Sequence, residues 1–169
     1  MLRRLVHVLS FAVVVGCGAP APEPTKPPIQ EVAAVEPQLT ISARCRIDGC
    51  PLDSDDVPIV ITITNRSLVP VDVPIAFLQQ SGPVIRLIDE RTRAELYLRK
   101  PPANFELLRT PTTLASGASA DIDWVIHTAE LRHFGSPFDV TAEITIATQV
   151  GTAGQTTQYT DATTLRFTD

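Results

Sequence analysis

Residues 38–169 are predicted to form an all-β domain, an antiparallel sandwich of two sheets. Three observations predict this class. Apolar and polar residues alternate with a period of two along most of the segment, as in strands with one buried face. Clusters of glycine, proline, asparagine and serine separate the alternating runs. The segment is also long enough to bury about two-thirds of its unfolded-chain surface and to fold as one domain.

The alternating runs assign the buried face of each strand. The first run, residues 39–47, turns one set of side chains inward: Leu39, Ile41, Ala43, Cys45 and Ile47. The second, residues 57–65, turns in Ile59, Ile61 and Ile63. Two short runs follow at 84–89 and 95–99, with the charged hairpin turn Asp89 to Arg93 between them. The last three runs bury the following: Ile122, Trp124 and Ile126 of 119–127; Val140, Ala142, Ile144 and Ile146 of 138–150; Leu165 and Phe167 near the end.

Turn signals close these runs. They stand at Asn65-Arg66-Ser67, Ser81-Gly82-Pro83, Lys100-Pro101-Pro102, Ser116-Gly117 and the loop Gly151 to Gly154. Only TAELRHF, residues 128–134, predicts a helical turn. The count and spacing of the runs predict an antiparallel immunoglobulin-like β-sandwich of seven to eight strands, with Trp124 and Ile126 in the core between the sheets. A small closed barrel is the alternative.

The first residues predict export. Arg3 and Arg4 precede a mostly apolar run, Leu5 to Val15, which is too short to span a bilayer and is typical of a secretory signal. We therefore expect residues 1–16 to be a signal peptide that is removed.

The end of this run, Val14-Val15-Gly16-Cys17, resembles the lipobox of bacterial lipoproteins. The resemblance implies that Cys17 carries a diacylglyceryl thioether and becomes the acylated N-terminus of a protein anchored in a lipid bilayer. Several acyl chains on one residue hold a protein firmly, because each buried methylene contributes about 0.8 kcal/mol. Gly18 stands where an aspartate retains such proteins in the inner membrane. In a Gram-negative organism the resemblance thus implies the outer membrane. An ordinary signal peptide is the alternative.

Residues 17–37 are predicted to be the lipidated cysteine and a disordered tether. Six of the twenty residues from 18 to 37 are proline, and none is aromatic. Such a segment cannot bury enough apolar surface to fold and is expected to act as an extended spacer.

Cys45 and Cys50 are predicted to form a disulfide, because an exported chain meets an oxidising compartment. A two-residue turn at Asp48-Gly49 would leave the two residues diagonal, at about 7–8 Å. We therefore expect a wider loop over residues 46–49. Two thiolates alone cannot complete a tetrahedral zinc site.

Charge and motifs argue against several functions. The net charge is −5, and no basic stripe is present, so nucleic acid is not an expected partner. His127, Glu130 and His133 lack the spacing of a zinc site. An acidic loop, residues 48–56, could hold calcium but lacks the EF-hand pattern. The sequence has no nucleophile elbow and no phosphate-binding glycine loop. We expect no enzyme activity and no cofactor.

A second resemblance concerns the domain. Asn65-Arg66-Ser67, Val69-Pro70-Val71 and Leu114-Ala115-Ser116-Gly117 before a tryptophan strand are similar to bacterial Ig-like domains of the intracellular proteinase inhibitor type. The residues themselves favour a non-catalytic binding or structural module at the cell envelope, in contact with another envelope protein. The resemblance implies, as the alternative, a tethered protease-inhibitor-like domain. Phe105, in a proline-rich loop, is the candidate contact residue, although it could equally fill the core.

Overall fold

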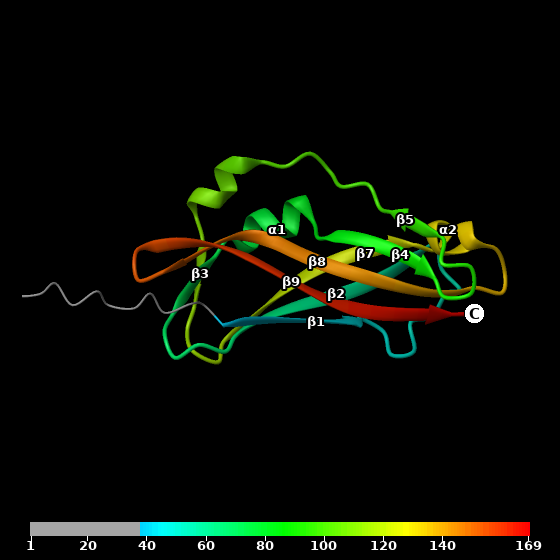
Figure 1. Ribbon diagram of the computed structural model, residues 1–169, viewed down its shortest axis with the longest axis horizontal. Helices are drawn as coiled ribbons and strands as arrows, with labels where there is room; N and C mark the ends of the chain where they lie inside the picture. Colours follow the sequence, from blue (N-terminus) through cyan, green and yellow to red (C-terminus); the bar gives the residue numbers. More distant parts are fainter. Residues whose placement is uncertain (1–37) are drawn as a thin grey trace, which may run out of the picture. The chain divides into compact units, whose positions relative to one another are not determined.

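The computed structural model describes residues 38–169, which form nine strands in two antiparallel sheets with three short helical segments between them (Figure 1). The strands are β1 (Leu39–Cys45), β2 (Asp56–Asn65), β3 (Val71–Val73), β4 (Val84–Asp89), β5 (Glu95–Tyr97), β6 (Thr112–Leu114), β7 (Ser119–His127), β8 (Asp139–Thr152) and β9 (Gln155–Thr168). The predicted sandwich is confirmed, but the predicted count of seven to eight strands is too low. The additional strands are β3 and β6, which pair with each other and have only three residues each, too few to show an alternation.

The two sheets differ in size. The smaller sheet has the order β1-β2-β7, so β1 and β7 are its edge strands. In the larger sheet β8 pairs with β9 along its whole length on one side. On the other side β8 pairs first with β4 and then with β3, which carry β5 and β6 respectively.

The longest feature is the β8–β9 hairpin. The sequence predicted a loop from Gly151 to Gly154 and a short last strand, but the ladder continues to the pair Thr152–Gln155. Only Ala153 and Gly154 form the turn, and both have positive φ, of 50° and 80°. Two such residues are typical of the type I′ turn that joins twisted strands. Gly151 lies inside β8 because β3 approaches it closely, and a Cβ there would stand 3.1 Å from the Cβ of Asp72.

The core between the sheets follows the predicted alternation. The isoleucines of β2 and the inward residues of β8 are fully buried: Ile59, Ile61, Ile63, Val140, Ala142, Ile144 and Ile146. Phe167 closes the core from β9. Ile47 is an exception, because β1 ends at Cys45 and the side chain of Ile47 is 55% exposed in the loop beyond it.

Trp124 also departs from its predicted place. Ile126 is fully buried as predicted, whereas Trp124 is only partly buried and packs against the rim of the core. Its ring lies over Gly82, where an added Cβ would come within 2.2 Å of the indole Cη2. Gly82 also has a φ of +68°, so glycine meets both a conformational and a steric requirement at this position.

Two of the three helical segments were not predicted. The predicted turn at residues 128–134 is present as α2 (Thr128–Leu131) and a 3₁₀ turn over Arg132–Phe134. The first unpredicted segment is α1 (Ile75–Ser81), which buries Ile75 and Leu78. The second is a 3₁₀ helix, η1 (Phe105–Arg109), in the connection between β5 and β6. Figure 1 shows this connection passing over α1.

Candidate interaction surface

Phe105 is exposed and is held by α1. Its side chain is 69% exposed, so it does not fill the core. Its ring lies 5.9 Å from that of Phe77 on α1, with a tilt of 32° between the planes. Phe77 in turn is partly buried against the core. The Phe105 ring is therefore exposed to solvent, and its contact with the Phe77 ring connects it to the folded domain.

Asn104 fixes the chain at Phe105. Its side-chain oxygen accepts a hydrogen bond from the Glu106 amide at 3.2 Å, which caps η1. Its own amide donates to the side-chain oxygen of Gln80 on α1, at 3.1 Å. An ion pair from Arg109 to Glu106 adds a further restraint inside η1. The candidate contact residue is thus positioned by side chains of both segments.

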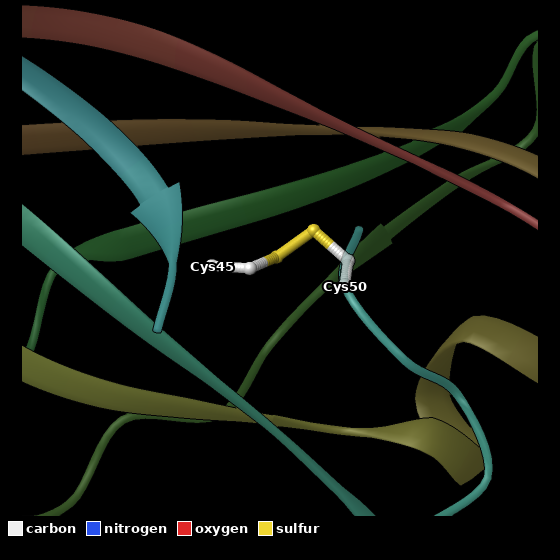
Figure 2. Close-up of a disulfide and its surroundings, with 2 residues drawn as sticks. All are labelled: Cys45 and Cys50. Atoms are coloured by element: carbon white, nitrogen blue, oxygen red, sulfur yellow. A yellow bond between two sulfur atoms is a disulfide. The ribbon is translucent and has the colours of Figure 1, made fainter. Parts of the chain in front are cut away.

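The cysteine pair is joined as predicted. Cys45 ends β1 and Cys50 lies beyond the loop over residues 46–49, with a distance of 5.3 Å between their Cα atoms (Figure 2). Cys45 is buried, and the Cys50 amide donates to the Ile47 carbonyl at 3.2 Å. The disulfide closes a short loop at one end of the smaller sheet, and its role there is to stabilise the fold.

The acidic loop is tied to the start of α2. Asp56 contacts the Nδ1 of His127 at 2.7 Å, and Thr128 donates its amide to the Asp55 carbonyl and its hydroxyl to the Ser54 carbonyl. Within residues 38–169, no group of three or more histidine, cysteine, aspartate or glutamate side chains could hold a metal ion.

His127 and Glu130 have a structural role at the start of α2. The carboxylate of Glu130 accepts from the His127 amide at 3.1 Å, while the His127 ring contacts Asp56. His133 instead lies edge-on to Phe134, with ring centroids 5.7 Å apart. The spacing of these three residues therefore reflects a helix start.

Asn65 joins the three short motifs that carried the Ig-like resemblance. Its side chain is fully buried, and its amide donates to the carbonyls of Val69 at 2.8 Å and Leu114 at 2.9 Å. Its oxygen accepts from the amide and the hydroxyl of Ser67. The Gly117 amide donates to the Asn65 carbonyl at 2.8 Å. The Asn-Arg-Ser and Leu-Ala-Ser-Gly segments thus meet around one buried amide, a role the sequence did not reveal.

Two carboxylates with lowered pKa values, Asp89 and Asp139, lie at the ends of strands. Hydrogen bonds from Thr92 and the Arg91 amide lower the pKa of Asp89, which closes the β4–β5 hairpin. A hydrogen bond from Arg166 lowers the pKa of Asp139 across the β8–β9 ladder. Both carboxylates therefore stabilise the local fold.

The lipobox residues, including Cys17, lie outside the described residues. Across residues 38–169, no helix is both long enough and apolar enough to cross a membrane.

Comparison with known proteins leaves the family open. No protein-family model matches the sequence, and no curated protein matches it. Among solved structures, the chain is similar to a protein from Archaeoglobus fulgidus with 13% identity and a TM-score of 0.38, covering 79% of this chain and 98% of that one. It is also similar to a Northeast Structural Genomics Consortium target with 6% identity and a TM-score of 0.40, covering 79% and 86% of the two chains.

Proposed function

We propose that this chain is a non-catalytic binding or structural module, anchored at the bacterial cell envelope by lipid on Cys17 and in contact with another envelope protein. The observation that carries the binding role is the exposed Phe105, held on α1 through Phe77 and Gln80. A large apolar side chain in this position favours association, since burying it contributes about 1.5–3 kcal/mol.

The restraints on Phe105 strengthen this proposal. Binding costs conformational entropy when a contact residue must be ordered, and a side chain that is already held avoids part of that cost. The capped η1 and the hydrogen bond between Asn104 and Gln80 supply such preorganisation.

The N-terminal features support the location. The signal-like run ends in the lipobox pattern at Cys17, and a proline-rich segment joins it to the first residue of the sandwich. In a Gram-negative organism, Gly18 after the cysteine favours the outer membrane over the inner one.

A photo-crosslinking amino acid at position 105 of the full chain, expressed in cells, tests the binding role. We expect a discrete adduct with one envelope protein. Tyr97 on β5 is a matched control, because it is also aromatic and is 61% exposed. No adduct at position 105, or the same adducts at both positions, would contradict the assignment of Phe105.

The alternative is a tethered protease-inhibitor-like domain. Residues 99–106 are all exposed and include Pro101 and Pro102, which stiffen the backbone as an inhibitory loop requires. Incubation of the full chain with a panel of serine, cysteine and metalloproteases distinguishes the two functions. Stoichiometric inhibition that is lost when Ala103 is replaced by proline would favour the inhibitor.

A further inference from the structure

The free edge of β7 is open in its middle. Two hydrogen bonds fix the register of the β2–β7 ladder, one at each end. The Asn65 amide donates to the Ala118 carbonyl, and the Thr128 amide donates to the Asp55 carbonyl. By the antiparallel alternation, the even-numbered residues of β7 bond to β2, and the odd-numbered residues direct their amides and carbonyls away from the sheet. Since β7 pairs only with β2, these outward groups have no strand partner within residues 38–169.

Side chains satisfy the two ends of this edge. The amide of Gln79 on α1 donates to the Asp121 carbonyl at 3.4 Å, and Glu130 of α2 accepts from the His127 amide at 3.1 Å. Between these two contacts lie Asp123 and Val125, whose outward amides and carbonyls offer two donors and two acceptors to an added strand.

A shallow cavity of about 290 Å³ lies along this segment. Its lining consists of Gln79, Asp123, Trp124, Val125 and His127. Trp124 gives it an aromatic wall, and Val125 is 39% exposed. The cavity therefore offers an apolar contact directly beside the unpaired backbone groups.

The solvent face of β7 carries two carboxylates, one of which is paired with an arginine. Asp121 and Asp123 both project to the solvent face of β7, where Asp121 accepts a hydrogen bond from Thr62 and Asp123 is paired with Arg46, the residue that follows β1. The cavity lining contains a carboxylate and no lysine or arginine. β7 itself contains neither the lysine nor the proline that commonly blocks strand addition at an edge.

We propose that the β7 edge binds an extended segment of a partner protein by strand addition, with an apolar side chain against Trp124 and a lysine or arginine beside Asp121 and Asp123. An added strand alternates its side chains in step with β7. Residues opposite Asp121 and Asp123 lie on the acidic face, and the residue opposite Trp124 lies on the aromatic side. The ligand is accordingly an alternating basic and apolar strand.

This inference rests on the proposed binding function but not on Phe105. α1 separates the two surfaces, because it contacts β7 through Gln79 and η1 through Phe77 and Gln80. Loss of crosslinking at position 105 would leave the β7 edge untouched, and failure of strand addition would leave Phe105 untouched.

A fluorescence titration tests the proposal, because Trp124 is the single tryptophan of the chain. The probe is the blocked heptapeptide Lys-Val-Lys-Val-Lys-Val-Lys, added to the full chain in a nonionic detergent. We expect a saturable change in Trp124 emission and markedly weaker binding of the matching Glu-Val peptide. Absence of a saturable change, or equal binding of the two peptides, would overturn the proposal.

Val125→Pro blocks the edge without removing a bond to β2, because the Val125 amide points outward. We expect it to weaken peptide binding by about two- to tenfold, the loss of one hydrogen bond. Ala43→Pro is the matched control, since its amide also points away from β2, on the opposite edge of the same sheet. Equal binding by Val125→Pro and the wild type would contradict strand addition.

Two further measurements complete the test of strand addition. The first does not depend on whether a protein variant folds, and the second detects self-association of the chain. A peptide N-methylated at alternate residues loses the complementary hydrogen bonds, which its own amides would donate to the β7 carbonyls, and it is expected to bind at least as weakly as the unmethylated peptide binds Val125→Pro. Sedimentation of the full chain without peptide tests pairing of two β7 edges. A dimer that the peptide dissociates would assign the edge to a second copy and overturn the choice of a partner protein.

Discussion

Replacing Asn65 with alanine should destabilise the domain strongly, because one buried amide satisfies main-chain groups of two loops. The substitution leaves the Ser67 amide and the carbonyls of Val69 and Leu114 without this partner. A buried polar group left unsatisfied costs about 1–3 kcal/mol. With Asn65 fully buried, and with partial relief from water entering the small cavity, we expect a loss of about 3–5 kcal/mol in the free energy of unfolding.

Urea unfolding followed by Trp124 fluorescence measures this loss. Ser119→Ala is a suitable control, since it removes the exposed hydrogen bond between the Ser119 and Thr64 hydroxyls and should change the free energy by less than about 0.5 kcal/mol. A loss below about 1 kcal/mol for Asn65→Ala would refute the reasoning that this amide holds the two loops together.

Three other substitutions test separate parts of the fold. Replacing Cys45 and Cys50 together with serine should lower the free energy of unfolding by about 2 kcal/mol, the chain-entropy value for so short a loop, and an unchanged urea midpoint would contradict it. Asp89→Asn should lower the urea midpoint at pH 7. Because the folded-state pKa of Asp89 is lowered, its stabilising effect is present above the unfolded-state pKa of about 3.9 and is lost as the pH falls through the folded-state value. The difference between Asp89→Asn and the wild type should therefore shrink below about pH 4, and a difference that is constant with pH would count against this assignment. Gly82→Ala should displace the Trp124 ring and shift its emission, since the new methyl group would overlap the indole; an unaltered spectrum and stability would show that the ring does not lie there.

The sequence predicted those parts of the fold in which a strand has one buried face. β2 and β8 show this most clearly, because their alternating isoleucines lie in the core as expected. The disulfide was predictable for a similar reason: only a loop wider than two residues brings Cys45 opposite Cys50.

Other features depend on tertiary contacts that no local pattern records. α1 follows Val71–Val73, and its alternating Ile75 and Phe77 continue the pattern of a strand, so its seven residues gave no helical period. Gly151 and Gly154 together predicted a loop over residues 151–154. Gly151 instead lies inside β8, where β3 approaches it closely, and it is not part of the turn.

The candidate surfaces were predictable only in part. Phe105 could be named from its loop, but its exposure depends on the docking of η1 against α1. The open edge of β7 could not be named at all, because strand order decides which strands lie at an edge. The hydrogen-bond network around Asn65 could not be predicted either, because it joins segments that are about fifty residues apart in the sequence.

Mass spectrometry of the mature N-terminus, from protein isolated from its own cells, tests the central claim most directly. An envelope-anchored module requires a chain that begins at Cys17 and carries a diacylglyceryl thioether on its sulfur. Replacement of Cys17 with serine should then release the protein from the membrane fraction. A native chain that begins at Met1, or one cleaved elsewhere and free of lipid, would contradict the account.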